Sequence, residues 1–227
     1  MQKRAGIVIA IDGVSGSGKS TLAKGLAARL GFVYLDTGAM YRAVTWKVLT
    51  DGIGVHDESR VVAAARRLSL TVAPGDAGMK VFVDGADVSE EIRRPYVSDN
   101  VSVVAAYGGV RERMVGLQRE IAADHNIVLE GRDVGTVVFP NADLKFFIDA
   151  SVDERAKRRL AELQAKGIAT SLEDVRKNIE ERDRIDSGRQ VSPLRKAPDA
   201  LAIDSTGMTI DEKTDKALAI ARERLRL

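Results

Sequence analysis

The spacing of hydrophobic residues changes several times along the chain, and these changes predict alternating strands and helices. Residues 6–12 are almost continuously apolar, as in a buried strand of a parallel sheet. After a glycine-rich turn, Leu22, Leu26 and Leu30 recur every four residues, which predicts an amphipathic helix. The elements expected next are a strand at 32–35 and helices at about 38–49 and 57–68.

Between residues 68 and 95, hydrophobic residues recur at every second position instead of at every third or fourth. Apolar and polar residues alternate on both sides of the turn-rich run 74–78, and Asp84-Gly85 is typical of a β-hairpin. This pattern predicts a small antiparallel sheet. We therefore expect an inserted subdomain at about 68–95 and a core domain made of 1–67 and 96–227.

The alternation of helical and strand patterns resumes beyond the insert. A polar, turn-rich stretch at 187–198 predicts a mobile loop. The other elements expected here are helices at about 110–123, 152–163, 172–182 and after Thr209, and strands at 127–129, 144–148 and 201–203. Strands that alternate with helices predict an α/β fold whose parallel sheet is flanked by helices.

The glycine-rich turn after the first strand matches a phosphate-binding loop (P-loop). Residues 13–20 fit G-x-x-x-x-G-K-[ST] at every fixed position, between a predicted strand and a predicted helix. Glycines let successive backbone N–H groups point at phosphate oxygens, and the helix N-terminus adds partial positive charge. We expect Lys19 on the β- and γ-phosphates of ATP and Ser20 on Mg²⁺. The residues expected around the ATP phosphates are Gly13, Val14, Ser15, Gly16, Ser17, Gly18, Lys19, Ser20 and Thr21.

The signature motifs of two other classes of P-loop protein are absent from this chain. A GTPase needs Asn-Lys-x-Asp to read guanine, and no Asn here is followed by Lys. A transport ATPase needs Leu-Ser-Gly-Gly, which is also absent. The sequence therefore favours a small-molecule kinase, which must also hold an acceptor.

Three segments that combine arginine with acidic residues are candidates for the acceptor site, at 36–42, 130–136 and 181–189. The first two follow predicted strands, and ligands bind at the carboxyl ends of strands in open α/β sheets. Each segment also has a structural explanation. Arg42 could be a solvated surface residue, 130–136 a turn with a local Arg–Asp pair, and 181–189 a salt-bridged helix end.

Together with the P-loop, these segments resemble the bacterial cytidylate kinases over essentially the whole chain. The run Gly-Arg-Asp-Val-Gly-Thr-Val-Val-Phe-Pro at 131–140 is the most specific part of the resemblance. The resemblance implies transfer of the γ-phosphate of ATP to CMP or dCMP, with Mg²⁺ as cofactor. Another small-acceptor P-loop kinase, of the UMP, thymidylate or shikimate type, is the alternative. A nucleotide-responsive binding protein without turnover is a third possibility.

The resemblance also implies a role for individual residues. The catalytic set is Lys19, Arg132, Arg182 and Arg189. Thr37, Arg42, Arg132 and Arg189 would hold the acceptor phosphate, Ser102, Arg111 and Asp133 the cytosine edge, and Asp186 the ribose. Arg182 would reach over the transferring phosphate from a lid at about 182–197. The chain departs from the family pattern at Glu130, where Asp is common, and at Ser20, where some members carry Thr or Gly.

Composition limits the remaining possibilities. Lys and Arg number 35 against 33 Asp and Glu, for a net charge of +2, which does not suggest a nucleic-acid binder. The chain has no cysteine, which excludes disulfides and thiolate metal sites, and the first apolar run is too short to span a membrane. We expect a cytoplasmic, monomeric protein whose partners are CMP, dCMP and ATP rather than nucleic acid or membranes.

Overall fold

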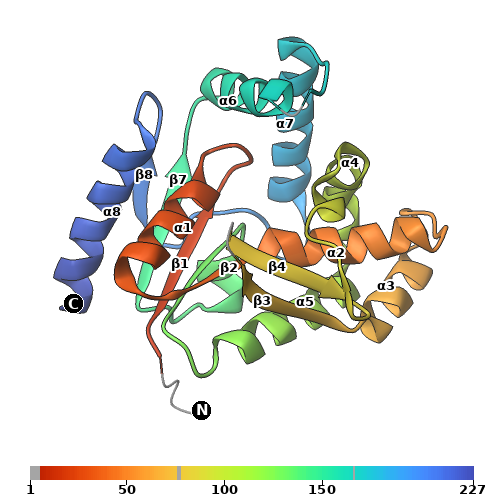
Figure 1. The fold of residues 1–227 in the computed structure, drawn as a ribbon, viewed down its shortest axis with the longest axis horizontal. Coiled ribbons are helices and arrows are strands. Elements are labelled where there is room, and N and C mark those ends of the chain that lie inside the picture. Colours follow the sequence, from red (N-terminus) through yellow and green to blue (C-terminus); the bar gives the residue numbers. More distant parts are fainter. Residues whose placement is uncertain (1–5, 76–77, 166) are drawn as a thin grey trace.

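The computed structural model, which describes residues 6–75, 78–165 and 167–227, has a five-stranded parallel sheet at its centre (Figure 1). The strand order is β2-β6-β1-β7-β8, and every neighbouring pair is parallel. The strands are β1 (Val8–Gly13), β2 (Val33–Asp36), β6 (Ile127–Gly131), β7 (Leu144–Asp149) and β8 (Leu201–Asp204). The predicted α/β class is confirmed.

Two hydrophobic cores lie on the two faces of this sheet. Val8 and Ala10 of β1 belong to one core, whereas Ile9 and Ile11 belong to the other, because successive strand side chains point to opposite faces. The second core is covered by helices α1 (Lys19–Leu30) and α8 (Ile210–Leu225). The first is covered by α2 (Thr37–Thr50), α3 (Glu58–Arg67) and α5 (Gly108–Ala122). Burial on both faces explains why β1 is continuously apolar.

The insert is a separate antiparallel sheet, as its alternating pattern predicts. Its order is β3-β4-β5, with Leu70 opposite Val83. The strands are β3 (Leu70–Gly75), β4 (Gly78–Val83) and β5 (Ala86–Asp87). Strand β4 contacts α2 and β2, so the insert packs beside the core (Figure 1). The proposed domain boundaries and the lid remain predictions.

Three features of the second half differ from the expected elements. Helix α4 (Pro95–Val104) was not predicted, although proline at the first helical position is a recognised start signal. A π-helical turn, η2 (Val134–Val138), follows β6. Helix α7 (Leu172–Gly188) is longer than expected, so the first part of the predicted lid is helical. The remaining elements are η1 (Glu91–Arg93) and α6 (Val152–Ala165).

The fold brings the chemistry-bearing segments to one end of the sheet. The P-loop follows β1, residues 36–42 follow β2, and residues 132–136 follow β6, all at carboxyl ends of parallel strands. Helices α4 and α7 lie above this edge (Figure 1). No helix among the described residues is long and apolar enough to cross a membrane.

Candidate active site

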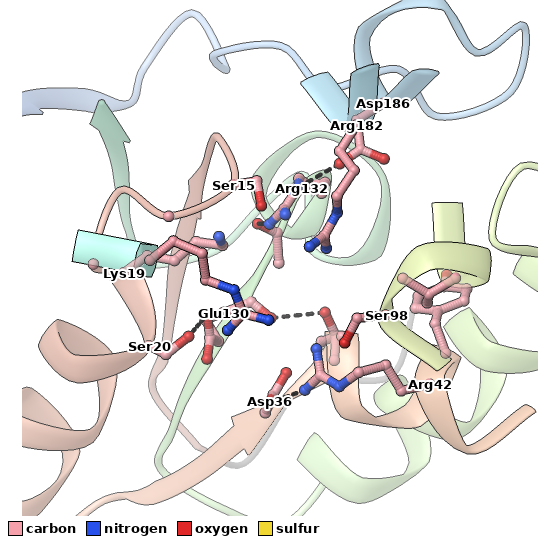
Figure 2. Close-up of a pocket in the computed structure, with 18 of the residues that line it drawn as sticks. Ser15, Lys19, Ser20, Asp36, Arg42, Ser98, Glu130, Arg132, Arg182 and Asp186 are labelled. Atoms are coloured by element: carbon pink, nitrogen blue, oxygen red, sulfur yellow. Dashed lines mark hydrogen bonds and ion pairs between the residues drawn. The ribbon is translucent and has the colours of Figure 1, made fainter. Parts of the chain in front are cut away.

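A single cleft of about 610 Å³ joins the P-loop to the predicted acceptor residues (Figure 2). Every residue assigned above to the acceptor lines it, and so does Arg182 of the predicted lid. These residues are Thr37, Arg42, Ser102, Arg111, Arg132, Asp133, Arg182, Asp186 and Arg189. On the P-loop side the lining residues are Ser15, Gly16, Gly18, Lys19, Ser20 and Thr21. Gly13, Val14 and Ser17 of the predicted set are not among the lining residues.

The P-loop curls because its glycines adopt left-handed backbone conformations. Gly16 has φ 77° and Gly18 has φ 80°, a region that residues with a side chain rarely enter. Helix α1 begins immediately afterwards at Lys19, so its free N–H groups face the cleft. This geometry is suited to binding phosphate.

The carbonyl groups of the P-loop are held by side chains from distant elements. The Ser17 carbonyl accepts a hydrogen bond from Ser205 Oγ at 2.9 Å, and the Gly18 carbonyl accepts one from Lys213 Nζ at 3.1 Å. The Ser15 carbonyl accepts one from Arg155. These three contacts hold the carbonyl groups of residues 15, 17 and 18 and so help to fix the path of the loop. The sequence assigned no role to these three side chains.

Lys19 is buried at the mouth of the P-loop, where its amine donates to the Val14 carbonyl at 3.1 Å. Burial, followed by repulsion from Arg132, lowers the pKa of Lys19 to about 7, while Glu130 opposes the shift. Phosphate groups beside the amine would favour its charged form. Lys19 is thus placed to bind an anion.

Glu130 ends β6 directly opposite Ser20. The Ser20 hydroxyl donates to Glu130 Oε2 at 2.8 Å (Figure 2). The Tyr34 hydroxyl donates to Glu130 Oε1 at 2.6 Å. Burial raises the pKa of Glu130, and the nearby Asp36 raises it further. Hydroxyl and carboxylate oxygens are the ligands that Mg²⁺ prefers, so this pair fits the cofactor. No cluster of three His, Cys, Asp or Glu side chains exists within the described ranges, so phosphate and water would complete the shell.

Arginines and carboxylates alternate around the acceptor half of the cleft. Arg42 pairs with Asp36 at 2.6 Å, and Arg132 Nε pairs with Asp186 at 2.7 Å (Figure 2). Arg189 also pairs with Asp186. Burial opposes ionisation of Asp36, but Arg42 and Arg93 hold its pKa below the ordinary value. The carboxylates thus hold the guanidinium groups in place within the cleft.

Arg182 has a buried Nε atom without a hydrogen-bond partner, as do Arg42, Arg111 and Arg189 in the same cleft. Burial, followed by repulsion from Arg132, lowers its pKa to about 10, so the side chain stays charged at neutral pH. A buried cation with an unsatisfied donor is suited to an anionic ligand.

The three residues expected to read a base are buried and line the cleft. Arg111 Nη2 pairs with Asp133 at 2.5 Å, and its Nη1 donates to the Ala105 carbonyl at 3.0 Å. The Arg111 guanidinium lies 5.0 Å from the centre of the Tyr41 ring, which fixes its plane. The Ser102 hydroxyl lies 3.4 Å from Asp186. Asp133 therefore faces Arg111 as well as the cleft.

Asp12 is a site residue that sequence reasoning missed. Its carboxylate accepts hydrogen bonds from the N–H groups of Val134 at 2.8 Å and Gly135 at 2.7 Å, immediately after Arg132 and Asp133. Burial raises its pKa to about 6. Asp12 thereby fixes the start of η2. An acidic residue at the end of an apolar strand was the only available signal, and it does not identify a partner.

Comparison with known proteins decides the family. The model of the family described as "Cytidylate kinase" matches residues 9–223, which include the P-loop and all three arginine segments. The chain belongs to the cytidylate kinase family. It is 51% identical over 219 residues to the cytidylate kinase of Limosilactobacillus reuteri (strain DSM 20016), covering 96% of each chain. It is 47% identical to that of Geobacillus kaustophilus (strain HTA426), covering 96% of this chain and 98% of the other.

A solved structure agrees with the fold. The crystal structure of an uncharacterised protein from Eubacterium ventriosum ATCC 27560 matches with a TM-score of 0.51 and 15% identity, covering 94% of this chain and 97% of that one. This similarity concerns the fold alone. Membership in the cytidylate kinase family confirms the resemblance that the sequence motifs indicated, and it implies ATP as the phosphate donor.

Proposed function

We propose that the protein transfers the γ-phosphate of ATP to CMP or dCMP, giving ADP and CDP or dCDP. The observation that carries this proposal is the cleft that joins a P-loop to Arg42, Arg132, Arg182 and Arg189, in a chain of the cytidylate kinase family. A phosphate oxygen of the acceptor attacks the γ-phosphorus, and the bond from that phosphorus to ADP breaks. The protein's task is to align the two nucleotides and to offset their repulsion.

The donor phosphates are assigned to the P-loop. The free N–H groups at the N-terminus of α1 bind the phosphate oxygens, and Lys19 contacts the β- and γ-phosphates. Ser20 and Glu130 are the residues that would hold Mg²⁺, which when bound neutralises phosphate charge. Lys19 acts most strongly at the transition state, where charge spreads over the transferring group.

The acceptor phosphate is assigned to Arg42, Arg132 and Arg189, with the Thr37 hydroxyl beside them. Planar guanidinium groups bind phosphate oxygens in pairs, which fixes both position and orientation. Arg182 is assigned to the transferring phosphate. Because it lies on α7 at the start of the predicted lid, we expect its contact to form when the lid closes and excludes water.

Base recognition is assigned to Ser102, Arg111 and Asp133. Cytosine offers an amino donor that a carboxylate can accept, whereas uracil presents an oxygen at the same position. Uracil would leave Asp133 facing an acceptor, and a buried unpaired polar group costs about 1–3 kcal/mol. That cost corresponds to a preference for CMP over UMP of about tenfold to a hundredfold. The ribose is assigned to Asp186, whose carboxylate already serves two arginines, so dCMP remains a good acceptor.

The test is an acceptor survey. Purified protein with MgATP is mixed separately with CMP, dCMP, UMP, dTMP and shikimate, and ADP formation is followed. We expect rapid turnover with CMP and dCMP, slower turnover with UMP and background rates with the others. Faster turnover with dTMP or shikimate than with CMP, or no turnover with any acceptor, would contradict the proposal.

A further inference from the structure

One residue of the P-loop is held on both sides by an ion pair from two other elements. The Ser15 N–H donates to Asp183 Oδ1 at 3.2 Å, and the Ser15 carbonyl accepts from Arg155 Nη1 at 2.9 Å. Arg155 Nη1 also pairs with Asp183 Oδ2 at 2.5 Å. The arginine and the aspartate therefore close a ring of hydrogen bonds around the Ser15 backbone.

This ring joins three parts of the protein that are far apart in sequence. Ser15 belongs to the P-loop, Arg155 to α6 and Asp183 to α7, and Ser15 and Asp183 are 168 residues apart. Arg155 is only 4% exposed, and its Nε donates to the Ala150 carbonyl at 2.9 Å. A Cβ added at Gly16 would lie 3.3 Å from Arg155 Cβ, so the side chain packs closely on the loop. These contacts hold the Arg155 side chain in place independently of its ion pair with Asp183.

Asp183 is adjacent in sequence to Arg182, but the two side chains contact different parts of the protein. Arg182 lines the cleft, as do Asp186 on α7 and Arg189 just after this helix, whereas Asp183 accepts a hydrogen bond from the Ser15 N–H of the P-loop. Figure 2 shows Arg182 reaching into the cleft from α7, with Ser15 on the facing side. The distance between Arg182 and the P-loop therefore depends on how α7 is attached to Ser15.

We infer that Asp183 and Arg155 are a positioning pair that sets the place of Arg182 over the transferring phosphate. The inference rests on the proposed kinase function. Neither Asp183 nor Arg155 is among the residues that line the cleft, so the pair needs no contact with substrate. Its effect passes through α7, because a small misplacement of a group that stabilises the transition state can reduce the rate about a hundredfold.

Asp183→Asn tests the pair with little change in size. The asparagine keeps an oxygen for the Ser15 N–H but loses the charge that holds Arg155. Glu180→Gln is the matched control, since Glu180 lies on the same helix and pairs only at the surface with Arg176, whose side chain is 51% exposed. Arg155→Lys removes the planar fork while keeping the charge. The double variant, Asp183→Asn with Arg155→Lys, completes a double-mutant cycle that measures the coupling between the two residues.

We expect kcat with CMP to fall about tenfold or more in Asp183→Asn, with KM for CMP changed less than about threefold, because ground-state contacts remain. ADP formed in excess of CDP should rise, since a poorly closed lid admits water. The double variant should be no slower than the slower single variant, as expected for residues that act as a unit. Glu180→Gln should match wild type in each measurement.

Three results would overturn the inference, provided that wild type phosphorylates CMP. The first is a lower Tm for Asp183→Asn with unchanged kcat and unchanged ADP excess, which indicates a structural role alone. The second is tighter ATP binding with unchanged kcat, which indicates that Asp183 competes with phosphate for the Ser15 N–H. The third is multiplicative loss in the double variant. A wild type that does not phosphorylate CMP would instead reject the proposed function.

Discussion

The donor and acceptor halves of the cleft are built in different ways. The donor half is a continuous loop whose backbone N–H groups meet the ligand, and its shape follows from glycines at fixed positions. The acceptor half has no such loop. Its arginines come from α2, the turn after β6 and the end of α7, and each is held by a carboxylate or packed side chain. Backbone recognition is local, whereas side-chain recognition requires the whole fold.

This difference predicts that single substitutions in the two halves have different kinetic effects. In the donor half, Lys19 is the cation that the P-loop itself supplies. The acceptor half shares its charge among several arginines. Loss of Lys19 should therefore have the largest effect, and loss of a single acceptor arginine should act mainly on one step.

Lys19→Ala should reduce kcat at least a hundredfold and leave the fold intact. The amine offsets charge on the phosphate oxygens, and removal of one such transition-state contact typically costs about 10²-fold or more. Steady-state kinetics with CMP and a thermal melt measure the two effects. A variant that retains more than about a tenth of the wild-type kcat would exclude this role for Lys19.

Arg42→Ala and Arg182→Ala should separate binding from catalysis. Arg42, paired with Asp36, faces the acceptor phosphate before closure, so its loss should raise KM for CMP about tenfold or more, with a smaller change in kcat. Arg182 acts on the transferring phosphate, so its loss should mainly lower kcat. Both constants are obtained from CMP titrations at saturating MgATP. A rise in KM alone for Arg182→Ala would mean that it binds the ground state.

Asp133→Asn should reduce the preference for CMP over UMP. The amide can donate to the uracil oxygen, so the ratio of kcat/KM values should fall about tenfold. Ser102→Ala should weaken CMP turnover and shrink the ratio less. If Asp133 serves only to hold Arg111, Asp133→Asn would slow both acceptors equally and leave the ratio unchanged.

Asp12→Asn should change how stability depends on pH. The folded pKa of Asp12, about 6, lies above its ordinary value of 3.8, so its favourable contribution is present below pH 3.8 and is lost as pH rises through 6. The free energy of unfolding of wild type, measured relative to the asparagine variant, should therefore fall by about 3 kcal/mol over this range. Urea titrations at several pH values measure it. A difference that grows with pH would contradict the assigned shift.

The ease of prediction from sequence follows the same division. The P-loop is contiguous, so its motif alone placed residues 13–20 between a strand and a helix. The period of two located the antiparallel sheet for a similar reason. The segments of Arg42 and Arg132 were candidates because they follow predicted strands, but the roles of single acceptor residues came from the family resemblance. Nothing in the position of Ser102 in the sequence shows that it shares their cleft.

The residues that sequence reasoning missed bind backbone groups that only the fold brings near. Asp12 meets an N–H group 122 residues away, and Asp183 meets one 168 residues away. Lys213 reaches the Gly18 carbonyl from α8. A backbone partner leaves no trace in the sequence of the partner residue, so such contacts require a structure.

The central claim is direct transfer between two nucleotides held in one cleft. It is tested most directly with ATP labelled in its γ-phosphate, mixed with Mg²⁺ and equal amounts of CMP and UMP, followed by separation of the products. We predict that the label appears mainly in CDP, in amounts equal to the ADP formed. Label found mainly in inorganic phosphate, or in UDP as much as in CDP, would contradict the claim.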